Sequence, residues 1–338
     1  MKPRRVLILT VVAALTLSVL GGVSSASVAS GKKPVAGLVL SGEPNDGGYY
    51  QDTFEAFKKA AKKFKFKTKL VTNVGYDTET IVDAFDNLIS AGAAFVIGDG
   101  VMTAAGQVAA EDHPDVPIFV ETAPVPEGIA NLHGYVAQQG IGAYILGALA
   151  PEISSSGKVG VLGGFEDPPS MQAIAGFTAG AESAGAEVSS VTVGSYSDPV
   201  LAKAAAAAMI ANGVDVIYAY LDAGLVGVSQ AIEESGDDVA LFSATGSKRA
   251  DKTRCAANSS LVAQTFQNID KQLVQTFSDF KEDNVTGGNT FWGFEDPKIQ
   301  RISFCSGQED AALSKIVDDT VASINSGEIE LGSDITGA

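Results

Sequence analysis

The sequence predicts an α/β protein with two lobes, each built on a parallel β-sheet covered by helices. Short β-branched runs alternate with helical stretches along most of the chain, and this alternation is typical of parallel sheets with helices on both faces. The pattern runs to about Tyr135 and restarts at Lys158, with no Gly/Ser-rich linker between the halves. About 75 residues follow the second half, too few for a third domain. We therefore expect the chain to return and complete both lobes, with a cleft facing the strand ends of each.

The first strand–loop–helix unit, residues 35–64, predicts one wall of that cleft. Val35 to Leu40 is an apolar run of strand length, and residues 41–48 are rich in glycine and other turn formers. Phenylalanine and alanine then recur every three or four positions up to Phe64, as on one face of a helix. In a parallel sheet such a loop lies at the carboxyl edge, where ligands bind beside the free amides of the helix start. The residues expected at this edge are Asn45, Asp46, Tyr49 and Tyr50.

The remaining elements follow from the same two patterns. Short apolar or β-branched runs predict strands at 69–72, 94–97, 117–121, 158–162, 188–193, 214–220 and 239–243, and near residues 291 and 302. Residues 260–265 form a further segment of the chain past the second half. Residues 131–136 are expected to form an extended connection. Helical patterns predict helices at 78–90, 138–152, 170–184, 200–211, 270–281 and 310–324. Two more helices follow the loops at 98–100 and 222–224, and they end at about residue 110 and at residue 235. Asp77 or Thr78 can cap the helix at 78–90, and Asp198-Pro199 begins another.

Residues 1–30 have the features of a secretory signal peptide. A basic end is followed by an apolar middle, residues 6–20, and then by small residues suited to cleavage. No cysteine lies near the cleavage region, so no lipoprotein anchor is expected. We expect a soluble mature protein that is periplasmic or secreted.

The charge balance and the motif content exclude several classes of function. A net charge of −17 argues against nucleic acid and anionic membrane surfaces as partners. Common catalytic and phosphate-binding motifs are absent, and His113 and His133 are isolated from any partner at metal-ligand spacing. A pair of carboxylates could still support an enzyme, because acidic residues are abundant. We expect no enzyme, no cofactor and no metal.

Cys255 and Cys305 are the only cysteines. In an exported chain we expect such a pair to form a disulfide, and the alternative is two separate buried thiols.

Other candidate binding residues follow predicted strands in the same way as the first loop. Asp99, Asp222 and Gln267 can orient polar groups of a ligand, and Phe165 and Tyr196 can stack on a flat one. For each aromatic residue the alternative is packing in the core. For Asp46 the alternative is a helix cap, and for Tyr49 and Tyr50 it is half-buried packing.

Several motifs resemble the basic membrane protein family, the purine-nucleoside receptors of ABC importers. The family has a loop of the form Asn-Asp-x-x-Phe-Asn after its first strand, and here it is Asn45-Asp46-Gly47-Gly48-Tyr49-Tyr50. The resemblance continues, in the same order, through Gly163-Gly164, Gly176-Phe177, residues 195–199, residues 212–216 and residues 324–329.

The resemblance implies a type I periplasmic-binding-protein fold, with two lobes joined by three crossings. The first lobe would comprise 34–136 plus about 263–295, and the second 137–262 plus about 300–331. It implies an extracytoplasmic binding protein, a monomer, that captures a small planar solute and delivers it to a membrane permease with ATPase subunits. The alternatives are a sensor that presents its ligand to a membrane receptor, or an enzyme on the same scaffold.

Carried over from the family, Tyr49 takes the place of a stacking phenylalanine and Tyr196 is its candidate partner from the second lobe. The sequence departs from the family at two polar positions, since Thr245 and Gln267 stand where an aspartate and a lysine are usual. We therefore expect a nucleobase-like ligand with a weaker demand for ribose, because neutral hydrogen bonds are weaker than charged ones.

Overall fold

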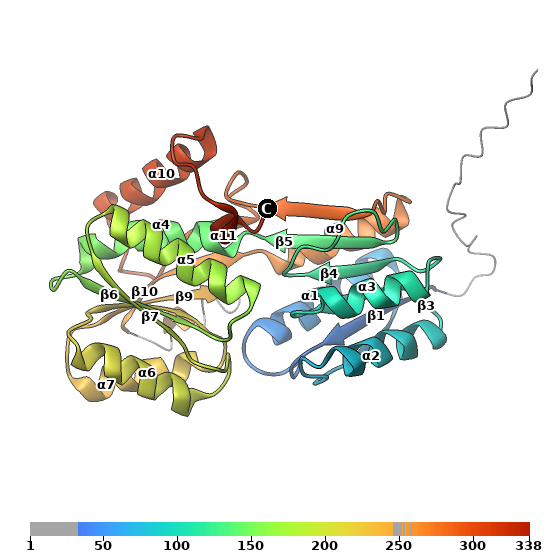
Figure 1. Cartoon of the computed structure of the whole chain (residues 1–338), viewed down its shortest axis with the longest axis horizontal. Coiled ribbons are helices and arrows are strands. Elements are labelled where there is room, and N and C mark those ends of the chain that lie inside the picture. The colour runs from blue at the N-terminus through green and yellow to red at the C-terminus, as the bar shows by residue number, and fades with distance from the viewer. Residues whose placement is uncertain (1–32, 246–251, 253, 257–258) are drawn as a thin grey trace, which may run out of the picture. The chain divides into compact units, whose positions relative to one another are not determined.

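A computed structural model describes residues 33–245, 252, 254–256 and 259–338. The expected signal peptide lies outside the described residues. The described part contains two sheets of six strands, each covered by helices on both faces (Figure 1). This is the two-lobed α/β architecture that the alternation of strands and helices predicts.

The first sheet has the strand order β11-β5-β4-β3-β1-β2, and every pair in it is parallel. Its strands are β1 (Val35–Leu40), β2 (Lys67–Val71), β3 (Ala93–Asp99), β4 (Ile118–Glu121), β5 (Leu132–Ala137) and β11 (Gly288–Trp292). Helices α1 (Tyr49–Phe64) and α9 (Ile269–Lys281) pack on one face, and α2 (Thr78–Ser90) and α3 (Thr103–Asp112) pack on the other. β1 and β3 are almost wholly buried, as strands covered on both sides must be, which explains their continuous apolar runs.

The expected extended connection at 131–136 is in fact the core strand β5, which pairs with β4 and β11. Its glycine and histidine weakened the strand pattern. A β-carbon on Gly134 would lie 2.3 Å from Asn289 Oδ1, so glycine leaves room for the Asn289 amide, which bonds the backbone of Val125.

The second sheet has the order β12-β10-β9-β8-β6-β7, with β12 antiparallel to β10 and the other pairs parallel. Its strands are β6 (Lys158–Gly163), β7 (Glu187–Thr192), β8 (Val216–Tyr220), β9 (Ala240–Thr245), β10 (Leu261–Gln267) and β12 (Gln300–Phe304). One face carries α4 (Gln139–Ile153), α5 (Pro168–Ser183) and α10 (Ala311–Ser326), and the other carries α6 (Pro199–Ala211) and α7 (Leu225–Ser235). The short helix α11 (Ser333–Thr336) contacts α4 and α5.

The chain passes between the two sheets three times within the described residues. The crossings follow β5 at Gln138, β10 at Asn268 and β11 at residues 293–299. The expected boundary places the return to the first lobe at about 263. The return comes after Gln267 because β10 first completes its pairing with β9 in the second sheet.

The crossings are tied to one another by backbone hydrogen bonds. Gln138 N donates to Trp292 O at 2.9 Å, and Asn268 N donates to Ile299 O at 2.8 Å. The Gln139 side chain, just after the first crossing, donates to Gln267 Oε1, just before the second. The segments that join the lobes therefore form one bonded hinge.

A disulfide joins Cys255 to Cys305, at the end of β12, with their Cα atoms 5.3 Å apart. The bond closes a loop across 50 residues and links the segment after β9 to the antiparallel edge strand.

We predict that the unreduced, denatured protein has no titratable thiol. Replacing both cysteines with alanine should lower the free energy of unfolding by about 2–4 kcal/mol, because the cross-link restricts the unfolded chain. Chemical denaturation of both proteins measures this difference. Two thiols titrating in the unreduced sample would contradict the bond.

Candidate functional site

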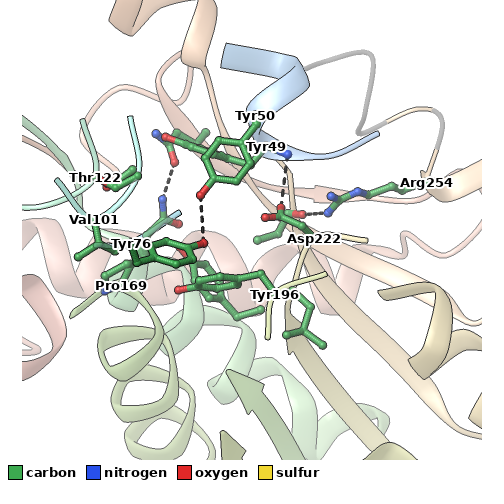
Figure 2. Close-up of a pocket in the computed structure, with 15 residues that line it drawn as sticks. Tyr49, Tyr50, Tyr76, Val101, Thr122, Pro169, Tyr196, Asp222 and Arg254 are labelled. Carbon is green, nitrogen blue, oxygen red and sulfur yellow. Dashed lines mark hydrogen bonds between the residues drawn. The ribbon is translucent and has the colours of Figure 1, made fainter. Parts of the chain in front are cut away.

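A pocket lies between the carboxyl edges of the two sheets (Figure 2). Both lobes supply its walls, and its volume is about 80 Å³. The lining residues are Tyr49, Tyr50, Tyr76, Gly100, Val101, Thr122, Gln139, Pro169, Tyr196, Tyr220, Leu221, Asp222, Ala244, Arg254 and Gln267.

The loop before α1 positions Tyr49 and Tyr50 at the pocket. Asp46 Oδ1 accepts hydrogen bonds from Gly48 N at 2.8 Å and from Gln51 N at 3.1 Å, which closes the loop onto the start of the helix. Gly47 has φ +76, a left-handed conformation that favours glycine. Asp46 therefore acts as a local cap, and the helix start holds Tyr49 and Tyr50 against the pocket.

The hydroxyl groups of these tyrosines are fixed by neighbours in the first lobe. Tyr49 donates to Asp99 Oδ1 at 3.0 Å. The Tyr50 and Tyr76 hydroxyls lie 3.2 Å apart (Figure 2). The Tyr49 and Tyr50 rings meet edge to face, with centroids 5.9 Å apart. Three tyrosines thus form one side of the pocket with their rings locked in place.

Asp99 and Glu121 lie behind this side, on paired positions of β3 and β4. Both are buried, with 0% and 2% exposure. Burial raises the pKa of Asp99 to about 6, although the hydrogen bond from Tyr49 opposes the shift. Burial, followed by the charge of Asp99, raises the pKa of Glu121 well above its usual range. Neither side chain lines the pocket, and Asp99 is linked to it through its hydrogen bond from Tyr49.

The second lobe holds Tyr196 through its hydroxyl group. That group donates to the carboxylate of Asp167 at 2.7 Å and lies 2.8 Å from Ser170 Oγ. A β-carbon on Gly164 would lie 2.3 Å from the Tyr196 ring, so the Gly163-Gly164 motif gives the ring its space. The Tyr196 ring meets the Phe165 ring edge to face at 5.5 Å and lies 6.2 Å from Tyr220.

Two contacts join the lobes across the pocket. Asp222 Oδ1, in the loop after β8, accepts a hydrogen bond from Tyr49 N at 3.4 Å. Asp222 therefore accepts a hydrogen bond from the first turn of α1, where the cap residue Gly48 makes no side-chain cap bond. The Tyr76 ring also meets the Phe165 ring edge to face at 5.4 Å. Burial raises the pKa of Asp222 to about 7, against the opposing effect of the Arg254 guanidinium.

Polar groups near the hinge complete the pocket. Gln267 accepts from Gln139 and donates to Gln272 Oε1 at 2.6 Å, so both ends of its amide are bonded within the protein. Arg254 donates to the carbonyl of Ala244, at the end of the second sheet. Among the described lining residues, Arg254 is the only lysine or arginine.

The pocket brings together five of the residues that the sequence predicts as ligand contacts. These are Tyr49, Tyr50, Tyr196, Asp222 and Gln267. Asp46 and Asp99 bond the residues that line the pocket, and Phe165 packs against Tyr76 and Tyr196 one layer away. Asn45 is exposed and outside the lining. The side chain of Thr245 lies outside the described residues.

Several lining residues escaped the sequence analysis. Tyr76 follows β2 in a loop with turn residues and could have been found by the rule that picked Tyr49. Tyr220 ends β8 and Leu221 follows it, and their apolar character is typical of core residues. Arg254 lies in a polar stretch with no pattern, and only the neighbouring Cys255 marks it.

Sequence comparison gives the same family as the motifs. A family model described as Bmp, ABC transporter substrate-binding protein PnrA-like, matches residues 33–326. The chain belongs to this family. A purine-binding protein of Brucella abortus is 27% identical over 334 residues, covering 94% of this chain and 87% of the relative. Basic membrane protein A1 of Borrelia garinii subsp. bavariensis is 25% identical over 267 residues, 75% of each chain.

A solved structure supports the fold independently. A solute-binding protein of an ABC transporter system from Aeropyrum pernix K1 superposes with a TM-score of 0.76 at 17% identity, covering 88% of this chain and 93% of that one. The expected type I periplasmic-binding-protein fold is confirmed.

This Bmp-family chain is an extracytoplasmic substrate-binding protein of an ABC transporter, with a solute and a transporter as its partners. The family is one of binding proteins and not of enzymes. Within the described residues, no helix has the length and apolar character needed to cross a membrane.

We predict that Asp99 makes stability depend on pH. A carboxyl group whose pKa is raised on folding stabilises the fold most below its unfolded value, near 4, and the stabilisation is lost as pH rises through about 6. The loss amounts to about 3 kcal/mol for a shift of this size. Asp99→Asn keeps an acceptor for Tyr49 and should flatten the fall in unfolding free energy between pH 4 and pH 7.

Urea denaturation at several pH values measures the effect. The matched control is Asp237→Asn, a change at an exposed aspartate. Equal pH slopes for the wild type and Asp99→Asn would show that Asp99 does not carry the dependence.

Proposed function

We propose that the cleft binds a purine base or nucleoside, with its ring held by tyrosines from both lobes. The observation that carries the proposal is the placement of Tyr49 and Tyr196 on opposite lobes, both lining one pocket. Domain closure would bring such rings to the two faces of a flat ligand. The name of the Brucella relative, which covers almost the whole chain, supports a purine as the ligand.

The hydrogen bonds of the two tyrosines support the same use. Each hydroxyl group is held from behind by a carboxylate, Asp99 in the first lobe and Asp167 in the second. A ring fixed in this way loses little conformational freedom when a ligand stacks on it, so more of the contact energy appears as affinity.

The size of the pocket supports binding through movement of the lobes. A volume of about 80 Å³ is smaller than the cavity of about 150 Å³ that accommodates one benzene molecule. A purine therefore enters when the lobes part at the hinge, and the lobes then close around it. This is the hinge closure typical of binding proteins.

The demand for ribose is expected to be weak, as the replacement of charged family residues suggests. Gln267 lines the pocket, and its amide is already engaged by Gln139 and Gln272. A nucleoside can still bind, but the base should supply most of the affinity. The proposed partners are a membrane permease and its ATPase subunits. We propose that the protein acts as a monomer, in the periplasm or outside the cell.

We predict that calorimetry will detect binding of adenine, guanine or hypoxanthine, with nucleosides bound at similar affinity. Tyr49→Ala and Tyr196→Ala should each weaken binding by about 2- to 15-fold, because a stacked aromatic pair contributes about 0.5–1.5 kcal/mol beyond area burial. Tyr196→Phe keeps the ring but loses the hydrogen bond to Asp167, so it should bind more tightly than Tyr196→Ala and somewhat more weakly than the wild type.

Two outcomes would contradict this proposal. Nucleosides that bind far more tightly than their bases would reject the weak demand for ribose. Failure of every purine to bind, with the affinity of the true co-purifying solute unchanged by both alanine variants, would reject the tyrosine site.

We also predict that a bound purine lowers the radius of gyration. The contacts of Tyr49 with Asp222 and of Tyr76 with Phe165 join the lobes only when the cleft is closed. Small-angle scattering with and without saturating purine measures the change. Identical curves would contradict closure by the ligand.

A further inference from the structure

We propose that Arg254 selects 6-oxopurines over 6-aminopurines, and that the Cys255–Cys305 disulfide holds it in position to do so. The inference rests on the proposed purine site and adds the chemical edge of the base that the site reads. It concerns a residue outside the motifs on which the resemblance to the family rests.

The first support is the chemistry of the pocket wall. Its tyrosine hydroxyls and glutamine amides are neutral groups, and Arg254 is the only cation among the described lining residues. A guanidinium offers five N–H donors in a planar fork and no acceptor. One of these donors bonds the carbonyl of Ala244, which fixes the plane of the group beside the cleft (Figure 2).

The second support is the way the backbone of Arg254 is held. Its neighbour Cys255 is bonded to Cys305, which is 4% exposed and packed in the core of the second lobe. The Cys255 sulfur also accepts a hydrogen bond from Gln264 Nε2 at 3.4 Å. Gln264 Oε1 in turn accepts from Ser243 Oγ at 2.9 Å, so the anchor reaches two central strands. The anchor therefore holds the backbone next to Arg254, and the bond to the Ala244 carbonyl holds its side chain.

The third support is the match between a donor-only fork and a 6-oxopurine. Guanine and hypoxanthine present two neighbouring acceptors, O6 and N7, which arginine binds bidentately. Adenine replaces O6 with an amino group, so one arm of the fork would face a donor. Asp222, the acid of the same pocket, is an acceptor near Arg254 and can take the N1–H that oxopurines have and adenine lacks.

The deciding experiment is calorimetry with hypoxanthine and adenine on four proteins: the wild type, Arg254→Gln, Arg254→Lys and Lys252→Gln. The wild type should prefer hypoxanthine by about 5- to 150-fold, the range expected for one bidentate pair. Arg254→Gln should reverse the preference, because glutamine donates and accepts and so matches N7 and the amino group of adenine. A role in folding alone would weaken both ligands and could not reverse their order.

The other variants serve as checks. Arg254→Lys keeps a donor-only cation without the fork, so it should keep a reduced preference for hypoxanthine. Lys252→Gln removes an exposed charge two residues away and should behave as the wild type. Replacing both cysteines with serine should reduce the preference while leaving adenine binding nearly unchanged. An unaltered preference in that variant would overturn the positioning role of the disulfide.

The results also distinguish the proposed selectivity of Arg254 from the proposed purine site on which it rests. Binding of neither base, nor of guanine, overturns the purine site itself. Binding of both bases with equal affinity by the wild type, or an unchanged ratio in Arg254→Gln, overturns the selectivity of Arg254 and leaves the purine site standing. Thermal unfolding of each variant confirms that it is folded, and Arg254→Lys decides the matter if the glutamine variant is not.

Discussion

The hydrogen bonds of the hinge are the constraint on which the site depends. Each lobe has its own sheet and its own cores. The three crossings are therefore what hold the carboxyl edges of the two sheets opposite each other. The bonds from Gln138 to Trp292 and from Asn268 to Ile299 tie the crossings into one unit. Gln139 and Gln267 then extend the hinge directly into the pocket lining. The pocket lining therefore includes side chains that also bond across the hinge, and in the proposed site these shared side chains would couple binding to closure.

Most of the fold could be predicted from the sequence because it follows from local patterns. The apolar runs of β1 and β3, the Asp198-Pro199 helix start and the glycine stops each specify their own element. β5 was missed because Gly134, which leaves room for Asn289, weakens its strand pattern. The second crossing was placed early for a different reason, since only the pairing of β10 with β9 fixes where that strand ends.

The site was predictable only where a residue's role follows from its place in its own element. Tyr49 and Tyr50 begin a helix at a strand edge, and that position alone brings them to the cleft. The position of Asp99 is equally clear from sequence, but its burial behind Tyr49 is a matter of packing. Arg254 shows the opposite case, because no local pattern marks it. It lies at the pocket next to a disulfide whose two cysteines are 50 positions apart in the sequence.

Two buried acids beside the pocket, Asp99 and Glu121, lower the stability of the first lobe. Asp99 and Glu121 oppose each other across neighbouring strands, and burial raises the pKa of both. An apolar residue in place of Asp99 would stabilise the lobe, but it could not accept the hydrogen bond from the Tyr49 hydroxyl. Asp167 plays the same part for Tyr196. In both lobes a carboxylate outside the pocket lining holds a tyrosine that lines the pocket, so stability is given up where the proposed site needs a rigid ring.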